Sequence, residues 1–462
     1  MGESATAEGI RVFLANHDPG GLARVPYLAG GGMPLGAIPL REHVTADVVV
    51  VGAGIAGCSL ALHAAPGAAV VVLEAKEVGW GASSRNSGHV APATKVEPDA
   101  ILARYGEERG RQVIAASRIG PKLVFELAEK HDIDVGLERA GIVTAAHTGA
   151  AMSRLERRVS TLRRLGYQLD LLDRSSTSKV IGSDVRYYTG SVLDHDGGAI
   201  NPLAYVRGLA RAAVKAGARF HEATKALRVG RGTQKRWRVD TENGRVEADF
   251  VVLCTNGYTD DLWPGLRGSV VPVRAYQFMT VPIDERCEPP VLPTRVCMTD
   301  TRRLMSGVRK HRDSRLHFSG IGPLFGPEQV PNLTVSCGRI DRMFPQLKGI
   351  KLDYWWSGWM AMNADNSWKM HEMAPGALAA LGCNGRGVAL ATLIGRDLAK
   401  HVLGKSTDDT LIPFSPIRSI RAYSIHKPLV RALVSYYRFR DSVDEAFRPR
   451  PERSDTDALA SK

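Results

Sequence analysis

Residues 47–74 read DVVVVGAGIAGCSLALHAAPGAAVVVLE, and this stretch decides the fold. The β-branched apolar run at 48–51 is typical of a strand that is buried on both faces of a parallel sheet. Small residues dominate 55–65, as in a helix that lies close on a sheet, and 70–73 is a second buried strand. The order strand, helix, strand predicts a βαβ unit of an α/β protein.

Three glycines of this unit form a GxGxxG motif. Gly52 permits a tight turn, Gly54 lets a pyrophosphate approach the backbone, and Gly57 lets the helix pack on the strand. The helix N-terminus favours an anion, and Glu74 stands where an acidic residue bonds a ribose hydroxyl. The pattern predicts a dinucleotide site; the alternative is a glycine-rich turn in an ordinary α/β sheet.

Composition indicates a soluble globular protein of two or three domains, or of one large interleaved pair. The chain has 462 residues, of which 44% are hydrophobic and 24% charged. No apolar run approaches the roughly 20 residues of a membrane helix, and no secretory signal is evident at the N-terminus. The six cysteines are widely spaced without a CxxC motif, which favours reduced thiols in a cytoplasmic protein and no metal site.

The formal net charge is +13, which would suit an acidic partner. The densest basic cluster, at 154–164, falls on an expected helix with an apolar stripe, so we interpret it as a solvated face. No basic stretch alternates with aromatic residues, and nucleic-acid binding is therefore not expected.

Further elements follow along the chain. Residues 1–45 are read as an extended arm, disordered at its start, and the tail from Arg448 as disordered. Asn201-Pro202 is a helix start, and Asn243-Gly244 is a hairpin turn. We expect helices at 101–131, 151–165, 202–215 and 427–447, strands at 141–146, 219–229, 236–241 and 245–255, and a mainly antiparallel sheet over 270–356 that includes 271–280 and 315–319.

A second glycine loop lies at 382–387, between an expected strand at 378–381 and a helix that runs to about 403. A helix N-terminus at this place could hold negative charge on a ligand. The alternative is a plain turn between strand and helix.

Five stretches resemble the flavin-dependent amine and amino-acid oxidoreductases of the D-amino-acid-oxidase superfamily. They are VVVVGAGIAG (48–57), VVVLEAKEVGWGASSRNSGH (70–89), CTNGYTDDLWPGL (254–266), DYWWSGWMAMNAD (353–365) and ALGCNGRGVALATLIGRDLA (380–399). The pattern is similar to the γ-glutamylputrescine oxidoreductase and glycine–sarcosine oxidase branch. The resemblance covers roughly residues 40–440 and implies a Rossmann-like FAD domain with a discontinuous antiparallel-sheet substrate domain.

The resemblance also implies domain limits and a set of FAD contacts. The limits are an arm at 1–43, an FAD domain at 44–96, 197–268 and 357–412, a substrate domain at 97–196 and 269–356, and a C-terminal segment at 413–462. The implied FAD contacts are Gly52, Gly54, Gly57, Glu74, Ala75, Gly81, Ala82, Ser83, Ser84, Arg85, Asn86, Gly88, Thr255, Asn256, Gly257, Gly385, Arg386 and Gly387.

The implied reaction oxidises a C–N bond: hydride passes from the carbon beside an amine to flavin N5, the imine hydrolyses, and O₂ or another acceptor reoxidises the flavin. The substrate is a small-molecule amine or amino acid. His89 stands where related sequences commonly have Gln, so substrate-facing positions differ from the family pattern. The candidate catalytic residues are His89, Tyr276 and Arg309, with Trp359 and His371 as further substrate-side candidates.

Two other interpretations remain open from the sequence. A nicotinamide-dependent dehydrogenase would use the same GxGxxG signature, but it leaves the 382–387 loop unexplained. An FAD-bearing RNA-associated protein is suggested by the charge. The sequence does not disclose the amine, the acceptor or the oligomeric state.

Overall fold

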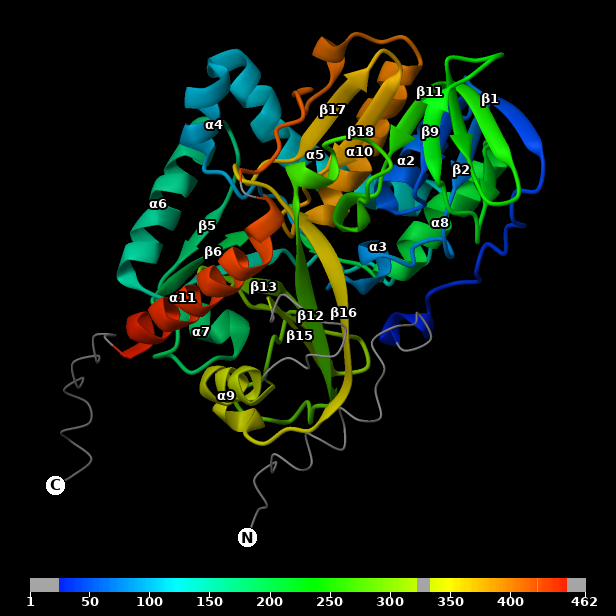
Figure 1. Cartoon of the computed structure of the whole chain (residues 1–462). Coiled ribbons are helices and arrows are strands. Elements are labelled where there is room, and N and C mark those ends of the chain that lie inside the picture. Colours follow the sequence, from blue (N-terminus) through cyan, green and yellow to red (C-terminus); the bar gives the residue numbers. More distant parts are fainter. Residues whose placement is uncertain (1–24, 322–332, 422, 447–462) are drawn as a thin grey trace, which may run out of the picture.

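The computed structural model describes residues 25–321, 333–421 and 423–446. They form two large sheets with their covering helices, one in the upper right of Figure 1 and one in its lower centre. Each sheet collects strands from distant parts of the chain. The expectations for the start of the N-terminal arm and for the tail fall outside the described residues.

The first sheet is centred on β1 (His43–Val51), the strand that the valine run predicts. β1 pairs in parallel with β2 (Val70–Leu73) on one side and with β11 (Arg245–Leu253) on the other. The strand order is β17-β18-β11-β1-β2-β8, with β9 and β10 as an antiparallel extension of β11. The other bounds are Arg219–His221 for β8, Arg228–Arg231 for β9, Trp237–Asp240 for β10, Lys369–Ala374 for β17 and Ala377–Leu381 for β18.

Both faces of this sheet are buried, which explains why its strands read as continuous apolar runs. Val48 and Val50 lie in one hydrophobic core, and Val49 and Val51 lie in another. The first core is covered by α2 (Ile55–Ala64), α5 (Glu107–Lys130), α8 (Pro202–Lys215) and α10 (Gly387–Val402). The helix start at Asn201 is confirmed, since its side chain accepts hydrogen bonds from the Leu203 and Ala204 amides.

The second sheet is antiparallel except for one parallel pair, β13 with β4, and has the order β16-β12-β15-β14-β13-β4-β6-β5. One of its faces packs against α7 (Arg174–Ile181) and α9 (Leu333–Met343). β16 stays in this sheet to Met362, so a domain limit at residue 357 would divide one strand. The bounds are Ile142–Ala146 for β4, Asp170–Leu172 for β5, Gly190–Asp194 for β6, Val271–Pro282 for β12, Cys297–Asp300 for β13, Gly307–Lys310 for β14, Arg315–Ile321 for β15 and Leu352–Met362 for β16.

Two expected elements are divided in the structure. The helix expected at 101–131 is two helices, α4 (Pro98–Tyr105) and α5, because Gly106 between them has φ of 76°. The strand expected at 219–229 is β8 and β9, because Ala223 between them has φ of 47° and its amide donates to the Lys76 carbonyl. The second break turns the chain toward the loop that follows β2.

Short elements and one basic helix complete this part of the fold. The short elements are α3 (Ala82–Arg85) and the two-stranded pair β3 (His89–Val90) and β7 (Gly198–Ala199). The basic cluster at 154–164 lies on α6 (Gly149–Arg164), where most arginines are exposed as expected. Arg158 differs, because it is partly buried and pairs with Glu97 at 3.0 Å.

The C-terminal helix α11 (His426–Ala446) crosses the second sheet (Figure 1). Val434 packs in a small core with Val273 and Leu304. Near the end of the helix, Asp441 accepts hydrogen bonds from the Arg303 amide and guanidinium. One face of α11 therefore holds it on the body of the protein.

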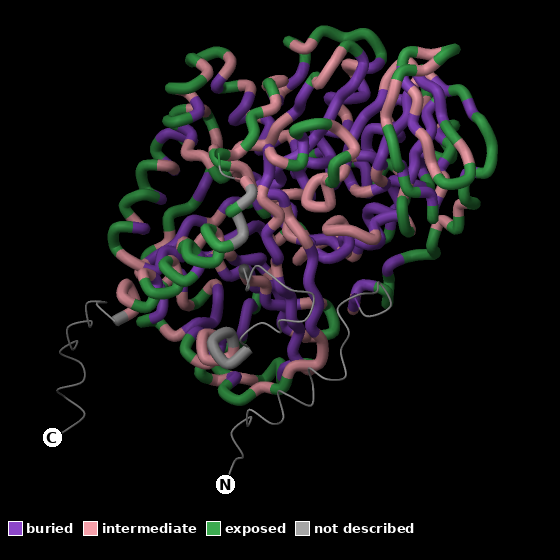
Figure 2. Tube along the Cα trace, in the orientation of Figure 1, coloured by how far each residue is buried: buried purple, intermediate pink, exposed green. Residues whose placement is uncertain are grey.

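The central strands of both sheets are largely buried, while edge strands such as β5 and β9 and the outer helices carry exposed positions (Figure 2). All six cysteines are free thiols, as the sequence predicts. Among the described helices, none combines the length and the apolar character needed to span a membrane.

Candidate functional site

The turn between β1 and α2 has the geometry that its three glycines predict. Gly52 has φ of 104°, a conformation that favours glycine. A Cβ on Gly57 would lie 2.0 Å from the Gly52 carbonyl oxygen, so this glycine permits the close helix–strand contact. A Cβ on Gly54 would lie 2.9 Å from Ser83 Oγ, which closes the turn from the other side.

Glu74 stands at the end of β2 and faces this turn. Its carboxylate accepts hydrogen bonds from the Ala53 amide at 2.9 Å and from the Lys76 amide at 2.9 Å. Burial raises the pKa of Glu74, while these backbone donors lower it. The carboxylate is thus fixed beside the glycine turn, where it can also accept a hydrogen bond from a ligand hydroxyl.

The segment that follows passes beneath the same turn. Ser83 Oγ accepts a hydrogen bond from the Ile55 amide at 2.9 Å, which joins α3 to the start of α2. Asn86 donates to the Ala82 and Ser83 carbonyls, and its Oδ1 accepts from the Gly88 amide. These local bonds fix a sharp bend without any regular element.

Arg85 is a structural member of this segment. Its guanidinium donates to the Trp80 carbonyl at 2.8 Å and to the Ser357 carbonyl at 3.3 Å. It also lies over the Trp80 ring, 5.1 Å from the centroid. Arg85 therefore ties the first sheet's loop to β16 of the second sheet.

The ends of β11 and β18 meet at Asn256 and Cys383. The Asn256 side chain donates to Cys383 Sγ at 3.3 Å and accepts from the Cys383 amide at 3.3 Å. Gly385 has φ of 81°, and the loop then enters α10 at Gly387. The second glycine loop therefore lies at the same edge of the first sheet as the GxGxxG turn.

Two adjoining cavities run along this edge. One has a volume of about 440 Å³ and extends from Glu74 past Gly52 to Asn256. The next, about 270 Å³, continues from Gly54 to the loop at 385–387 and reaches Gln277 and Gly358 of the second sheet. The two cavities share lining residues Gly54, Ala82, Ser83, Cys254 and Asn256.

Most of the predicted cofactor contacts line this pair of cavities: Gly52, Gly54, Glu74, Ala75, Gly81, Ala82, Ser83, Arg85, Asn86, Thr255, Asn256, Gly385, Arg386 and Gly387. Gly57, Ser84, Gly88 and Gly257 are not among the lining residues. Gly88 instead permits a close backbone contact, since a Cβ there would lie 2.1 Å from the Ile200 carbonyl oxygen. A Cβ on Gly257 would likewise lie 2.6 Å from the Trp359 carbonyl oxygen.

A third cavity of about 360 Å³ opens from the second one, with which it shares Asn86, Lys95 and Arg386. It extends between the second sheet and α6, and its walls are both apolar and charged. At its far end the Arg118 guanidinium donates to the Asp194 carboxylate at 2.6 and 2.7 Å. The cavity is thus bounded by a neutralised ion pair at that end.

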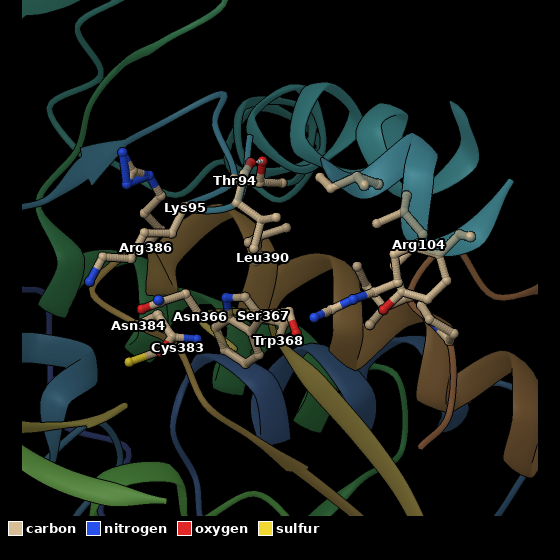
Figure 3. Close-up of a pocket in the computed structure, with 16 residues that line it drawn as sticks. Thr94, Lys95, Arg104, Asn366, Ser367, Trp368, Cys383, Asn384, Arg386 and Leu390 are labelled. Carbon is tan, nitrogen blue, oxygen red and sulfur yellow. Dashed lines mark hydrogen bonds between the residues drawn. The ribbon is translucent and has the colours of Figure 1, made fainter. Parts of the chain in front are cut away.

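Lys95 and Arg386 contribute positive charge where the second and third cavities join. Figure 3 labels both residues beside the loop that carries Cys383 and Asn384. Burial and the Arg386 charge lower the pKa of Lys95 to about 8. Burial and the Arg158 charge lower the pKa of Arg386 to about 10. Within the described ranges, neither side chain forms an ion pair, although the Glu97 carboxylate, which pairs with Arg158, also stabilises the charge of Arg386. The two cations can therefore receive a further anion.

His89 lines the third cavity on β3. Burial, and then the Arg309 charge, lower the pKa of His89 to about 3. Its Nε2 is buried and has no hydrogen-bond partner among the residues that the structure describes. Burial therefore favours the neutral form of the ring near pH 7.

The other candidates differ in their positions. Tyr276 does not line the cavities; its ring lies in the core of the second sheet, because the side chains of its neighbours Ala275 and Gln277 face the opposite side of β12. Arg309 is buried and donates to the Ser87 and Ile200 carbonyls, which makes it a support for the loop at 86–89. Trp359 lines the second cavity.

His371, a substrate-side candidate from the sequence, lies away from the three cavities. It lies buried on β17 of the first sheet, where its Nδ1 bonds to the Ser415 carbonyl at 2.7 Å. Burial lowers its pKa. His371 therefore belongs to the packing of that sheet rather than to the cavities.

The sequence does not indicate a series of buried, hydrogen-bonded side chains that ends at Gln277. His317 Nε2 is 2.8 Å from Gln277 Oε1, and His317 Nδ1 is 3.1 Å from the Tyr27 hydroxyl. Gln277 lines the second cavity, so this series of side chains fixes the orientation of a cavity-wall amide. No motif marks these residues, since they are distant in sequence and lie in ordinary strand and loop patterns.

An extended dinucleotide that carries a flavin fits these cavities. Glu74 stands at one end, the glycine turn at the middle, and the helix N-terminus of α10 at the other. A Cβ at Gly54 would narrow the passage between the cavities, which is the place for a pyrophosphate. The donor groups and the shape suit FAD at this edge of the sheet.

Comparison with known proteins agrees with this geometry. Residues 47–401 match the family model described as DAO, FAD dependent oxidoreductase. The chain is 31% identical over 411 residues to γ-glutamylputrescine oxidoreductase of Escherichia coli (strain K12), covering 87% of this chain and 94% of that protein. It is 24% identical to glycine oxidase of Geobacillus kaustophilus (strain HTA426), covering 81% and 97%.

Solved structures show the same fold. The crystal structure of glycine oxidase from Geobacillus kaustophilus matches with a TM-score of 0.67 at 23% identity, covering 82% of this chain and all of that chain. The structure of L-proline dehydrogenase from P. horikoshii matches with a TM-score of 0.65 at 19% identity, covering 80% and 96%. The family match decides against a nicotinamide-dependent dehydrogenase, and the chain belongs to the DAO family of FAD dependent oxidoreductases.

Proposed function

We propose that this FAD-dependent oxidoreductase oxidises the C–N bond of an amine that also carries a carboxylate. Bound FAD would accept the hydride from the carbon next to the amine nitrogen. The observation that carries the proposal is the third cavity, which opens beside the 385–387 loop and has Lys95 and Arg386 at its entrance. Relatives named for amine or amino-acid substrates support the same class.

The cavity residues would place such a substrate in two ways. Lys95 and Arg386 would bind the carboxylate through charge-assisted hydrogen bonds. The neutral His89 would help keep the amine unprotonated. A protonated amine at this place would be a second desolvated positive charge close to Arg309, which is unfavourable. The volume of about 360 Å³ and the Arg118–Asp194 pair at the far end favour an extended, polar substrate over one the size of glycine.

A screen of amines and amino acids without oxygen tests the function. Each compound is mixed with the purified protein, and loss of the flavin absorbance reports hydride transfer. We expect bleaching with amines that carry a carboxylate and little with matched amides or with alcohols. Bleaching by alcohols alone would contradict the proposal. Oxygen or an artificial acceptor is then added to the reduced protein, and return of the flavin absorbance identifies the acceptor.

Replacement of His89 with alanine is expected to slow anaerobic flavin reduction while FAD is retained. Loss of one neutral hydrogen bond and of the packed ring should lower the rate of flavin reduction by roughly five- to tenfold. The pKa of His89 is about 3, so its ring does not titrate between pH 5 and 9, and the pH profile of the variant should keep the wild-type shape. Stopped-flow reduction across pH is the measurement.

The conservative change His89→Gln serves as the control and should stay near the wild-type rate. If His89→Ala leaves the reduction rate unchanged, His89 is a packing residue. If it removes a titration near neutral pH, the ring carries a proton that its burial argues against.

The FAD is expected to be bound without a covalent link. Cys383 belongs to the second glycine loop and lines the second cavity. Its Sγ accepts a hydrogen bond from the Asn256 side chain. Arg85, beside the glycine turn, donates to two backbone carbonyls. Acid precipitation should therefore give a colourless pellet and a yellow supernatant. A yellow pellet, with a flavin mass on a peptide containing His89 or Cys383, would show attachment.

A further inference from the structure

The outer face of α11 carries a stripe of exposed apolar side chains. Leu429, Leu433, Tyr436 and Phe439 are 54%, 44%, 50% and 64% exposed. Their spacing of four, three and three residues places them along one side of the helix. Exposed apolar side chains gathered in this way mark an interaction surface rather than scattered surface residues.

This apolar stripe is separate from the face that attaches α11 to the protein. Val434 and its partly buried neighbours Val430 and Tyr437 pack on the second sheet. The acidic residues near the helix end are engaged there as well, since Arg303 binds Asp441 and Asp444. The helix is therefore apolar on two opposite sides, and only one of them is covered by the described residues.

The exposed surface of α11 outside the stripe, and the segment just before the helix, are positive. Arg431 and Arg438 on α11, with Arg418 and Arg421 just before it, are exposed and form no ion pair within the part of the chain that the structure describes. Arg440 donates to the Tyr436 hydroxyl at 3.0 Å. The whole chain has a formal net charge of +13, so its overall charge also favours an anionic surface.

We propose that α11 binds the surface of an anionic lipid bilayer. The helix would lie parallel to the surface, with the stripe in the boundary between headgroups and acyl chains and the arginines among the phosphates. Tyr436 suits that boundary because its ring is apolar and its hydroxyl is polar. A second copy of the chain fits less well, because two such faces would bring their unpaired arginines together.

Vesicle co-sedimentation of the FAD-loaded protein tests this inference, which does not depend on the proposed substrate. We expect binding to vesicles of phosphatidylcholine and phosphatidylglycerol in equal amounts, and much weaker binding to phosphatidylcholine alone. Salt should weaken the binding, because the Debye length falls from about 10 Å at 0.1 M ionic strength to about 3 Å at 1 M.

Two variants separate the contributions. Leu433→Glu/Phe439→Glu should lower vesicle affinity by at least roughly tenfold, because two apolar side chains no longer enter the bilayer. Arg431→Glu/Arg438→Glu should abolish the preference for anionic vesicles. Both pairs are exposed, so FAD content and circular dichroism should match the wild type. Leu227→Glu, at a side chain that is 56% exposed and far along the chain, is the matched control and should bind as the wild type does.

The inference is wrong if the wild type does not bind anionic vesicles, or if both variants bind unchanged. It is also wrong if sedimentation shows a dimer that Leu433→Glu/Phe439→Glu dissociates without any vesicle binding by the wild type. That result would assign the stripe to self-association.

Discussion

Replacing Gly54 with valine is expected to give a folded protein that contains no FAD. A Cβ at this position already lies 2.9 Å from Ser83 Oγ, so the new side chain must displace Ser83 and its hydrogen bond to the Ile55 amide. The two valine methyl groups would enter the passage between the two cavities that we assign to the cofactor. The backbone at Gly54 has φ of −80°, which valine adopts without strain, and the fold itself should therefore persist.

Absorbance at the flavin band, relative to protein, measures this effect. Gly230→Val is the matched control, since a Cβ on Gly230 meets no atom within 4 Å, and this variant should carry normal FAD. The same secondary structure in both variants would show that the loss is local. Normal FAD content in Gly54→Val would mean that the pyrophosphate lies elsewhere.

Replacing Lys95 with methionine is expected to raise KM for an amine that carries a carboxylate by roughly 10- to 100-fold, the value of one hydrogen bond between charged groups. FAD content and kcat should change much less, because Lys95 would act in binding. The matched amide of the substrate should be nearly insensitive to the change. Steady-state kinetics with the acid and its amide gives both numbers, and Lys122→Met, at an exposed lysine of α5, is the control.

The pH dependence gives this prediction a second readout. The pKa of Lys95 is about 8, so the ammonium is present below that pH and is lost above it. KM of the wild type should therefore rise as the pH passes from 7 to 9, and KM of Lys95→Met should not. Lys95→Arg keeps its charge at high pH and should remove the rise while restoring binding. A wild-type KM that is flat over this range would place the carboxylate elsewhere.

The part of the fold that could be predicted from sequence is the part in which local pattern and tertiary environment agree. The valine run of β1, the small residues of α2 and the glycines between them each have one structural use, and their spacing is fixed by the βαβ geometry. Asn201-Pro202 and Asn243-Gly244 are similar, because their conformations are set by neighbours in the chain.

The rest depends on contacts between distant segments. The sequence offers Tyr276 as a substrate-side candidate. Side chains alternate between the two faces of a strand, and the sequence does not show which face of β12 meets the cavity. Lys95 lies in a loop without a motif, and its significance comes from Arg386 almost 300 residues later. His317 and Tyr27 meet only when the N-terminal segment lies against β15.

The parallel pairing of β1 with β11 has a consequence for biosynthesis. Val48 lies opposite Phe250, and β11 in turn pairs with β18, which precedes the glycine loop and α10. Contacts between residues so far apart in sequence form slowly, because a long loop must close before they contribute. A ribosome delivers the chain from its N-terminus, so the GxGxxG turn emerges long before its facing loop at 385–387 exists. We therefore expect tight cofactor binding only after α10 has been made, because a nascent chain that stops before α10 has only part of the cavities that we assign to the cofactor.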